Sequence, residues 1–206
     1  MNIGIGLIGL GGITQKVHIP DLLNAGHLTI VAICDIDPEA LESTRSKLGL
    51  PADCCFEDYR DLIACNEVDA VVIATPNHLH VEMALETVAA GKSYCVEKPL
   101  GLCARETAPL VKATQEAGVK SMVCFSYRYK AAARMAREMI RRGDIGKIHH
   151  ISMQYLQTWG NEEADCPLVW RFRKEYAGTG VLGDLGSHMV DFATFLTGRR
   201  FIEVTA

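Results

Sequence analysis

A glycine pair near the N-terminus is the first feature whose residue types could do chemistry. Gly9-x-Gly11 follows an alternating apolar run and leads into a helical pattern that reaches Ile19. Glycine supplies a turn with positive φ and a bare backbone, and the N-terminus of the following helix offers free N–H groups to an anion. The third position of a dinucleotide fingerprint is Thr14 here, in place of Gly or Ala. The stretch predicts a cradle for a nucleotide pyrophosphate.

A carboxylate closes the next apolar run. Asp35 lies 24 residues after Gly11, close to the separation of roughly 20 residues expected of the acid that binds an adenosine ribose. Such a carboxylate accepts both ribose hydroxyls and repels a 2′-phosphate, so it favours NAD over NADP. The alternative is that Asp35, or Asp37 after it, caps the helix that begins near Pro38.

Acidic residues and a histidine share one face of a helix near the other end of the chain. Asp184, His188 and Asp191 stand at i, i+4 and i+7. The neighbouring apolar face consists of Leu185, Met189, Phe192 and Leu196. Carboxylate and imidazole groups are suited to general acid–base catalysis. A polar stripe of this kind is also typical of a solvated helix surface, and both interpretations remain open at this point.

The elements that must position these residues follow from hydrophobic periodicity. Over the first 124 residues, short β-branched runs alternate with helical patterns, which is typical of βα units and a parallel sheet covered on both faces. Strands are expected at 3–8, 28–34, 54–56, 70–74, 93–96 and 121–124. A helix is expected at 78–90, and Pro109 predicts that the helical pattern 104–117 starts late or kinks. After residue 124 a helix rich in Ala, Met and Arg and a strand-like run at 148–156 begin a second domain.

Composition excludes several classes of function. The chain has 206 residues, of which 49% are hydrophobic and 22% charged, with a net charge of −4. No basic stripe is present, which argues against nucleic acid as a main partner. No run of 18 apolar residues offers a membrane span, and the first residues lack the features of a signal peptide. We therefore expect no membrane partner and a cytoplasmic location.

The eight cysteines do not follow a disulfide or metal pattern. They include no Cys-x-x-Cys pair, and none lies at zinc spacing from a histidine. Cys34, Cys95 and Cys124 fall within strand-like runs, where a free cysteine behaves as a small buried hydrophobic residue. We expect reduced cysteines, no catalytic thiol and no metal site.

Several motifs, in this order, resemble those of the Gfo/Idh/MocA family of NAD(P)-dependent oxidoreductases. They are Gly9-x-Gly11-Gly12, Asp35, ATPN at 74–77, EKP at 97–99 and GDLGSHMVD at 183–191. The resemblance runs across nearly the whole chain. It implies an α/β fold: a Rossmann, doubly wound parallel sheet at 1–124, followed at 125–206 by the first part of an α/β domain with an open sheet. Members of the family continue well beyond this point, so we expect the second domain to be incomplete and its exposed sheet edge to favour self-association.

The resemblance also implies roles for individual residues. Lys98 of the EKP motif is expected beside the nicotinamide, taking part in proton transfer, and Asp184 and His188 beside the substrate hydroxyls. The cofactor-binding residues that it implies are Gly9, Gly11, Gly12, Ile13, Asp35, Thr75, Pro76, Asn77, His80, Glu97 and Lys98. Further candidates for substrate contact are Arg128, Trp170, Arg171 and Asp191. The alternative for Arg128 is a surface position packed on neighbouring tyrosines, and the alternative for Trp170 and Arg171 is a role in anchoring their loop. The alternative for Asp191 is a hydrogen bond to a neighbouring residue only.

The activity that the resemblance implies is hydride transfer between a secondary alcohol of a sugar, cyclitol or related polyol and NAD, with NADP less favoured. Two alternatives share the scaffold: an NAD-dependent glycosidase, and a non-catalytic relative that senses nucleotide or acts in gene regulation. Lys98, Asp184 and His188 are all present, which argues against the non-catalytic class. A homo-oligomer, dimer or tetramer, is expected through the second domain.

Overall fold

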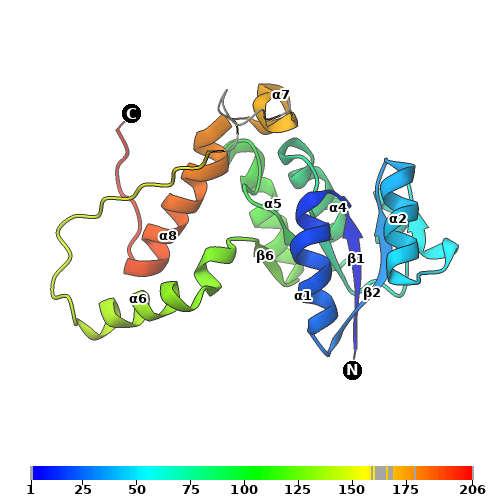
Figure 1. The fold of residues 1–206 in the computed structure, drawn as a ribbon, viewed down its shortest axis with the longest axis horizontal. Coiled ribbons are helices and arrows are strands. Elements are labelled where there is room, and N and C mark those ends of the chain that lie inside the picture. The colour runs from blue at the N-terminus through cyan, green and yellow to red at the C-terminus, as the bar shows by residue number, and fades with distance from the viewer. Residues whose placement is uncertain (1, 159, 161–165, 167–168, 179, 206) are drawn as a thin grey trace. The chain divides into compact units, whose positions relative to one another are not determined.

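The chain forms two compact units, Met1–Cys124 and Phe125–Ala206. The computed structural model in Figure 1 describes residues 2–158, 160, 166, 169–178 and 180–205. Among these residues, no helix is long and apolar enough to cross a membrane.

Six parallel strands form one sheet in the first unit. They are β1 Ile3–Ile8, β2 Leu28–Cys34, β3 Cys55–Phe56, β4 Ala70–Ile73, β5 Ser93–Val96 and β6 Ser121–Val123, in the order β3-β2-β1-β4-β5-β6. Strands β2 and β3 are added on one side of β1 and strands β4 to β6 on the other, and this switch between β1 and β4 is where α/β sheets bind ligands, at the carboxyl ends of the strands. The predicted Rossmann sheet is confirmed; β3, β4 and β6 are one residue shorter than predicted.

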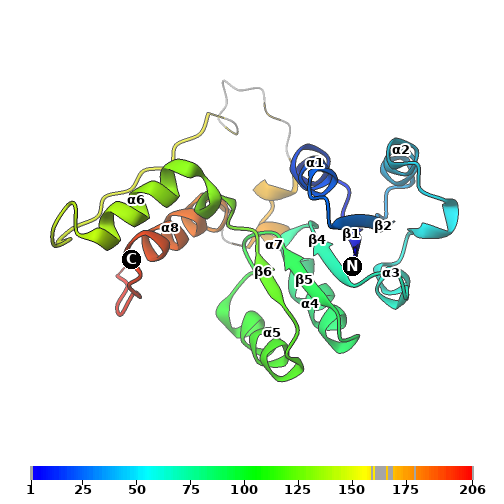
Figure 2. The same ribbon diagram turned by 90° about the horizontal axis from the view of Figure 1, so that it is seen from below.

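Helices cover both faces of this sheet. Figure 2 shows α1 Ile19–Asn24 and α2 Pro38–Leu48 on one face, and α3 Tyr59–Ala64, α4 His80–Ala89 and α5 Ala104–Ala117 on the other. Each face has its own apolar core because successive strand side chains point to opposite sides. Leu7 and Ile33 are fully buried with Ile19 of α1, whereas Ile73 and Val96 are fully buried on the other face. Each such side chain contributes about 1.5–3 kcal/mol relative to an exposed one.

Helix α5 corrects one prediction. It begins at Ala104 and runs through Pro109, so the late start considered from the sequence is wrong. Proline fits helical φ, but it removes the bond from its own position to the carbonyl four residues earlier, and its ring crowds that carbonyl. Leu110, the next residue, is fully buried in the core, so packing of the helix outweighs that loss.

The regular elements described in the second unit are helices and helical turns. A 3₁₀ turn at Ser126–Tyr129 precedes α6 Ala131–Arg142, and a 3₁₀ turn at Trp170–Phe172 precedes α7 Lys174–Ala177. A π-helical turn at Leu182–Gly186 leads into α8 Ser187–Thr197, which packs on α6. The strand-like run 148–156 has no strand assignment, because none of the described residues pairs with it. The open sheet expected for this domain is therefore not formed within the described part of 125–206.

The turn after β1 depends on the close approach of two backbones. Gly9 has φ +89°, and a Cβ at this position would lie 2.6 Å from the carbonyl oxygen of Ala74. The Gly9 N–H donates to the carbonyl of Cys34, and the Ala74 N–H donates to that of Ile8. Three strand ends are thus held together where only glycine fits.

We predict that Gly9→Ala lowers the free energy of unfolding by about 2–4 kcal/mol, from backbone strain and overpacking together. Gly49→Ala is the matched control, since Gly49 has φ +66° but nothing within 4 Å of an added Cβ. The control has only the strain, about 1–2 kcal/mol. Urea unfolding of both variants measures the difference, and an equal loss in the two would contradict the close-approach argument.

Candidate active site

The glycine loop leaves room beside its backbone. A Cβ added at Gly11 or Gly12 would meet no atom within 4 Å, and both glycines and Ile13 are exposed. Thr14, in contrast, is buried and its hydroxyl donates to the carbonyl of Gly9 at 2.6 Å. The third fingerprint position thus closes the loop by a side-chain hydrogen bond. Open space beside bare backbone at the start of a helix fits the pyrophosphate of a dinucleotide.

Asp35 joins this loop to the end of β2. Its Oδ2 accepts a hydrogen bond from the Leu10 N–H at 2.6 Å, and its Oδ1 accepts one from the Asp37 N–H at 2.9 Å. The cap of α2 is formed by Asp37, whose side chain accepts from the backbone N–H groups of Glu39 and Ala40. Asp37, and not Asp35, therefore caps α2. The contact of Asp35 with ribose stays a prediction.

His80 links the loops that follow β4 and β5. Its side chain is fully buried, with Nδ1 2.8 Å from the carbonyl oxygen of Pro99 and Nε2 2.9 Å from that of Thr75. Both partners are acceptors, so the two contacts favour a protonated ring, whereas burial favours a neutral one. Burial dominates and lowers the pKa of His80. The imidazole supports both loops, and its predicted contact with the cofactor is untested.

The other residues of the two loops are largely covered. Asn77 is buried, Thr75 and Pro76 are half-buried, and the Thr75 hydroxyl donates to the sulfur of Met83 at 3.7 Å. Lys98 is half-buried directly after Glu97 and donates its backbone N–H to Glu97 Oε2 at 3.1 Å. Their roles at the cofactor remain predictions.

Glu97 is held from the other side by a histidine. Its Oε1 lies 2.9 Å from His18 Nε2, and the two side chains are 15% and 14% exposed. His18 ends a π-helical turn, Thr14–His18, that joins the glycine loop to α1. Such turns are frequent at functional sites. The pair ties the first βα turn to the end of β5.

In the second unit, His188 lies among aromatic rings. It is buried and stacks on Tyr127, with ring centroids 4.5 Å apart and planes at 26°. Phe125 and Tyr155 approach it edge-on, each with centroids at 5.9 Å. The hydroxyls of Tyr127 and Tyr155 hydrogen-bond to each other. Burial and then this bond raise the pKa of Tyr155 to about 12, so its phenol stays protonated at neutral pH.

Asp184 lines a groove of about 640 Å³ in the same unit. It lies on the π-helical turn before α8, and Arg171 and Phe172 line the groove with it. The guanidinium of Arg171 lies over the Trp170 ring, 4.5 Å from its centroid. An acidic and a basic residue thus line one groove, and charged residues of this kind can bind the hydroxyls of a polar ligand.

Arg128 and Asp191 are paired with each other. Arg128 Nε lies 3.0 and 2.8 Å from the two carboxylate oxygens of Asp191, and a second guanidinium nitrogen bonds to the same carboxylate. The Asp191 side chain is only 8% exposed. The hydrogen bond to Asp191 raises the pKa of Arg128. The pair fastens the segment after β6 to α8, and its contact with substrate stays a prediction.

Two sequence profiles match the chain. The one described as "Oxidoreductase family, NAD-binding Rossmann fold" matches residues 3–125, and the one described as "GFO/IDH/MocA C-terminal domain" matches residues 133–206. The chain belongs to the Gfo/Idh/MocA family of oxidoreductases. Membership confirms the resemblance found in the sequence motifs and the NAD-binding character of the first unit.

Family relatives include several dehydrogenases. Levoglucosan dehydrogenase of Pseudarthrobacter phenanthrenivorans is 35% identical over 100% of this chain and 53% of its own length. Inositol 2-dehydrogenase of Rhizobium meliloti is 28% identical over 100% of this chain and 58% of its own length. The chain therefore spans about half the length of these curated relatives.

Solved structures of the family show the same fold. An oxidoreductase domain protein from Kribbella flavida superposes with a TM-score of 0.89 at 36% identity, covering 97% of this chain and 53% of that one. Levoglucosan dehydrogenase in complex with NADH gives a TM-score of 0.84 at 33% identity, covering 97% and 55%.

The structure adds side chains that the sequence analysis missed. His18 contacts Glu97 across 79 positions of sequence, and no local pattern marks such a pair. Tyr127 precedes Arg128, for which the sequence left open packing on neighbouring tyrosines, but the stacking of Tyr127 on His188 was not predicted. Gly9 and Asp35 meet at one loop, because Asp35 accepts the N–H of Leu10, whereas the contact of Asp35 with ribose stays a prediction.

We predict that His80→Leu lowers the free energy of unfolding by about 1–3 kcal/mol, because a buried carbonyl loses its N–H donor. Since the pKa of His80 is lowered in the folded state, its contribution is fully present above the unfolded pKa of ~6.5 and is lost as the pH falls below it. The variant should therefore lose less stability on acidification than the parent.

Urea unfolding above and below pH ~6.5 measures this difference. His27→Asn is the control, because His27 is exposed, and it should keep the pH dependence of the parent. A His80→Leu variant whose stability falls with pH as steeply as that of the parent would remove His80 as the cause.

Proposed function

We propose that this chain is the cofactor-binding unit and the beginning of the substrate-binding unit of an NAD-dependent dehydrogenase, which oxidises a secondary alcohol of a sugar, cyclitol or related polyol. The observation that carries the proposal is the carboxyl edge of the sheet. Open backbone at Gly11 and Gly12, the anchored carboxylate of Asp35 and the Glu97–Lys98 pair all follow strands that end at this edge.

NAD, when bound, accepts the hydride from the alcohol carbon. The hydroxyl proton must leave at the same time, and an amine or an imidazole within hydrogen-bond reach can take it. We assign this proton to Lys98, with His188 assisting and Asp184 accepting hydrogen bonds from substrate hydroxyls. The tyrosines around His188 limit its rotation, which supports a positioned acid–base group.

The proposal also assigns a role to each of the two units and an oligomeric state to the protein. Residues 1–124 bind the dinucleotide, and residues 125–206 contribute substrate contacts from the groove of Asp184 and Arg171. We propose a homo-oligomer through the second domain and a cytoplasmic location. The dehydrogenases among the relatives support the substrate class.

A glycosidase is the second candidate, because a relative from Shewanella pealeana, named a glycosyl hydrolase family 109 protein, is 29% identical over 81% of this chain. The two candidates differ in products. A dehydrogenase accumulates NADH in proportion to polyol consumed, whereas a glycosidase releases a sugar without net NADH. Incubation of the protein that carries this chain with NAD and a polyol panel, followed at the NADH absorbance, separates them; sugar release without NADH would overturn our proposal.

We predict that Lys98→Met lowers turnover ~10²–10⁴-fold, the usual cost of losing a general acid–base group. NADH affinity, measured by fluorescence titration, should change only a few-fold. Lys120→Met is the matched control, since Lys120 is exposed just before β6, at the amino end of the sheet, and it should retain parental turnover. Turnover of Lys98→Met within a few-fold of the parent would leave the proton to His188 alone.

We predict that the chain binds NADH more tightly than NADPH, and that Asp35→Asn reduces this preference by about tenfold or more, equivalent to at least about 1.4 kcal/mol of charge repulsion. The amide keeps an acceptor for the Leu10 N–H. Asp37→Asn removes a nearby charge from the cap of α2 and should leave the preference unchanged. Calorimetric titration measures both, and equal preferences in Asp35→Asn and the parent would show that Asp35 does not bind the ribose.

A further inference from the structure

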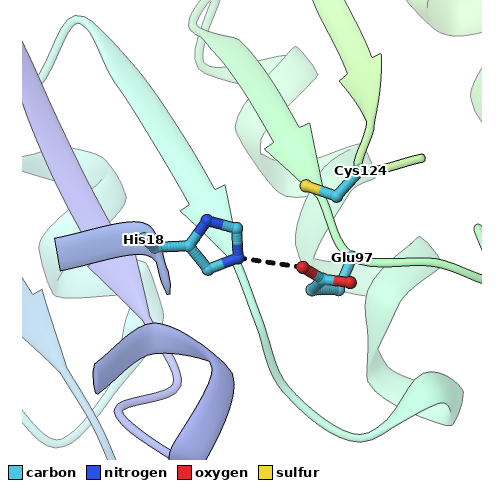
Figure 3. A group of neighbouring side chains, drawn as sticks. All are labelled: His18, Glu97 and Cys124. Atoms are coloured by element: carbon cyan, nitrogen blue, oxygen red, sulfur yellow. Dashed lines mark hydrogen bonds and ion pairs between the residues drawn. The ribbon is translucent and has the colours of Figure 1, made fainter. Parts of the chain in front are cut away.

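We propose that His18, Glu97 and Cys124 form a binding site for a zinc-like divalent cation at the carboxyl edge of the sheet. Figure 3 shows the three side chains converging from separate elements: the π-helical turn before α1, the end of β5 and the end of β6. One donor atom of each lies within 4.8 Å of the other two. This inference does not depend on the proposed dehydrogenase activity.

The spacing is close to what a tetrahedral ion requires. Zinc holds sulfur at about 2.3 Å and imidazole nitrogen or carboxylate oxygen at about 2.0–2.2 Å, so its ligand atoms lie roughly 3.3–3.8 Å apart. His18 Nε2 and Glu97 Oε1 are 2.9 Å apart and must separate slightly, while the other pairs, at no more than 4.8 Å, must close slightly. Movements on the order of 1 Å, within the range of side-chain rotation, convert the cluster into a coordination sphere.

The ligands are already held in place by their surroundings. Glu97 Oε2 accepts the Lys98 N–H at 3.1 Å, which leaves Oε1 directed at His18. The Cys124 N–H donates to the carbonyl of Val96 at 2.9 Å, which fixes the cysteine backbone against β5. Hydrogen bonds that orient ligands strengthen metal sites. The His18 and Glu97 side chains are only 14% and 15% exposed, so little water competes for them.

The donor set selects the kind of cation. Imidazole and thiolate suit zinc and other borderline-soft ions, whereas magnesium and calcium prefer oxygen alone. The neighbouring Cys95 Sγ lies 3.1 Å from Cys124 Sγ and forms a hydrogen bond with it. Three protein ligands leave a fourth position for water. The sequence contains no Cys-x-x-Cys pair and no cysteine at zinc spacing from a histidine, so the three ligands become neighbours only in the folded chain.

Zinc chloride is the probe. The reduced, chelator-treated 206-residue chain is titrated with it in competition with a chromophoric chelator, without nucleotide. We expect one zinc ion per chain, and His18→Asn and Cys124→Ser should each weaken its binding by about 100-fold or more, as expected when a ligand is lost. His27→Asn and Cys65→Ser make the same chemical changes at residues outside the cluster and should bind zinc as the parent does.

Two further measurements keep the test independent of folding defects. Zinc should raise the melting temperature of the parent and of both controls by mass action, but not that of His18→Asn or Cys124→Ser, whose folding is checked by circular dichroism. Cobalt(II) in place of zinc should give a thiolate charge-transfer band that Cys124→Ser abolishes and Cys65→Ser keeps. Absence of stoichiometric binding by the parent, or equal loss in variants and controls, would overturn the proposal.

Discussion

The close approach of the β1 turn to the end of β4 is the constraint on which the rest of the first unit depends. Gly9 occupies a positive φ with the Ala74 carbonyl where a Cβ would be, and this allows the glycine loop to sit over the central strands. Thr14 closes the loop from within, and Asp35 holds it from β2. Without that approach, the loop would have to rise from the sheet edge, and the bare backbone at Gly11 would no longer lie over the crevice.

The second unit relies on a different interaction, aromatic packing around an imidazole. Tyr127 stacks on His188 and is tied by its hydroxyl to Tyr155, while Arg128 and Asp191 join the same two segments by a charge-assisted pair. Ring contacts and a bidentate ion pair restrict orientation as well as distance. These contacts fix the position of α8 against the turn Ser126–Tyr129 that precedes α6.

Local patterns in the sequence were sufficient for the fold of the first unit. Short β-branched runs predicted all six strands, because helices cover both faces of the sheet and each strand buries side chains on both of them. These patterns failed at two places. Pro109 lies inside α5 because burial of Leu110 outweighs the lost hydrogen bond. The run 148–156 forms no strand because no described residue pairs with it. At the site, the sequence separation of Gly11 and Asp35 is compatible with the observed contact of Asp35 with the glycine loop. The contact of His18 with Glu97 depends on tertiary packing, which no sequence spacing indicates.

The position of His80 between two loops has a mechanical consequence. Its rigid ring contacts the carbonyls of both Thr75 and Pro99, and in the neutral form it donates to one of them and packs against the other. The loops after β4 and β5 therefore cannot be displaced independently without breaking a buried contact. A displacement of the Thr75 loop is transmitted through the ring to the Pro99 carbonyl, so the two loops move together.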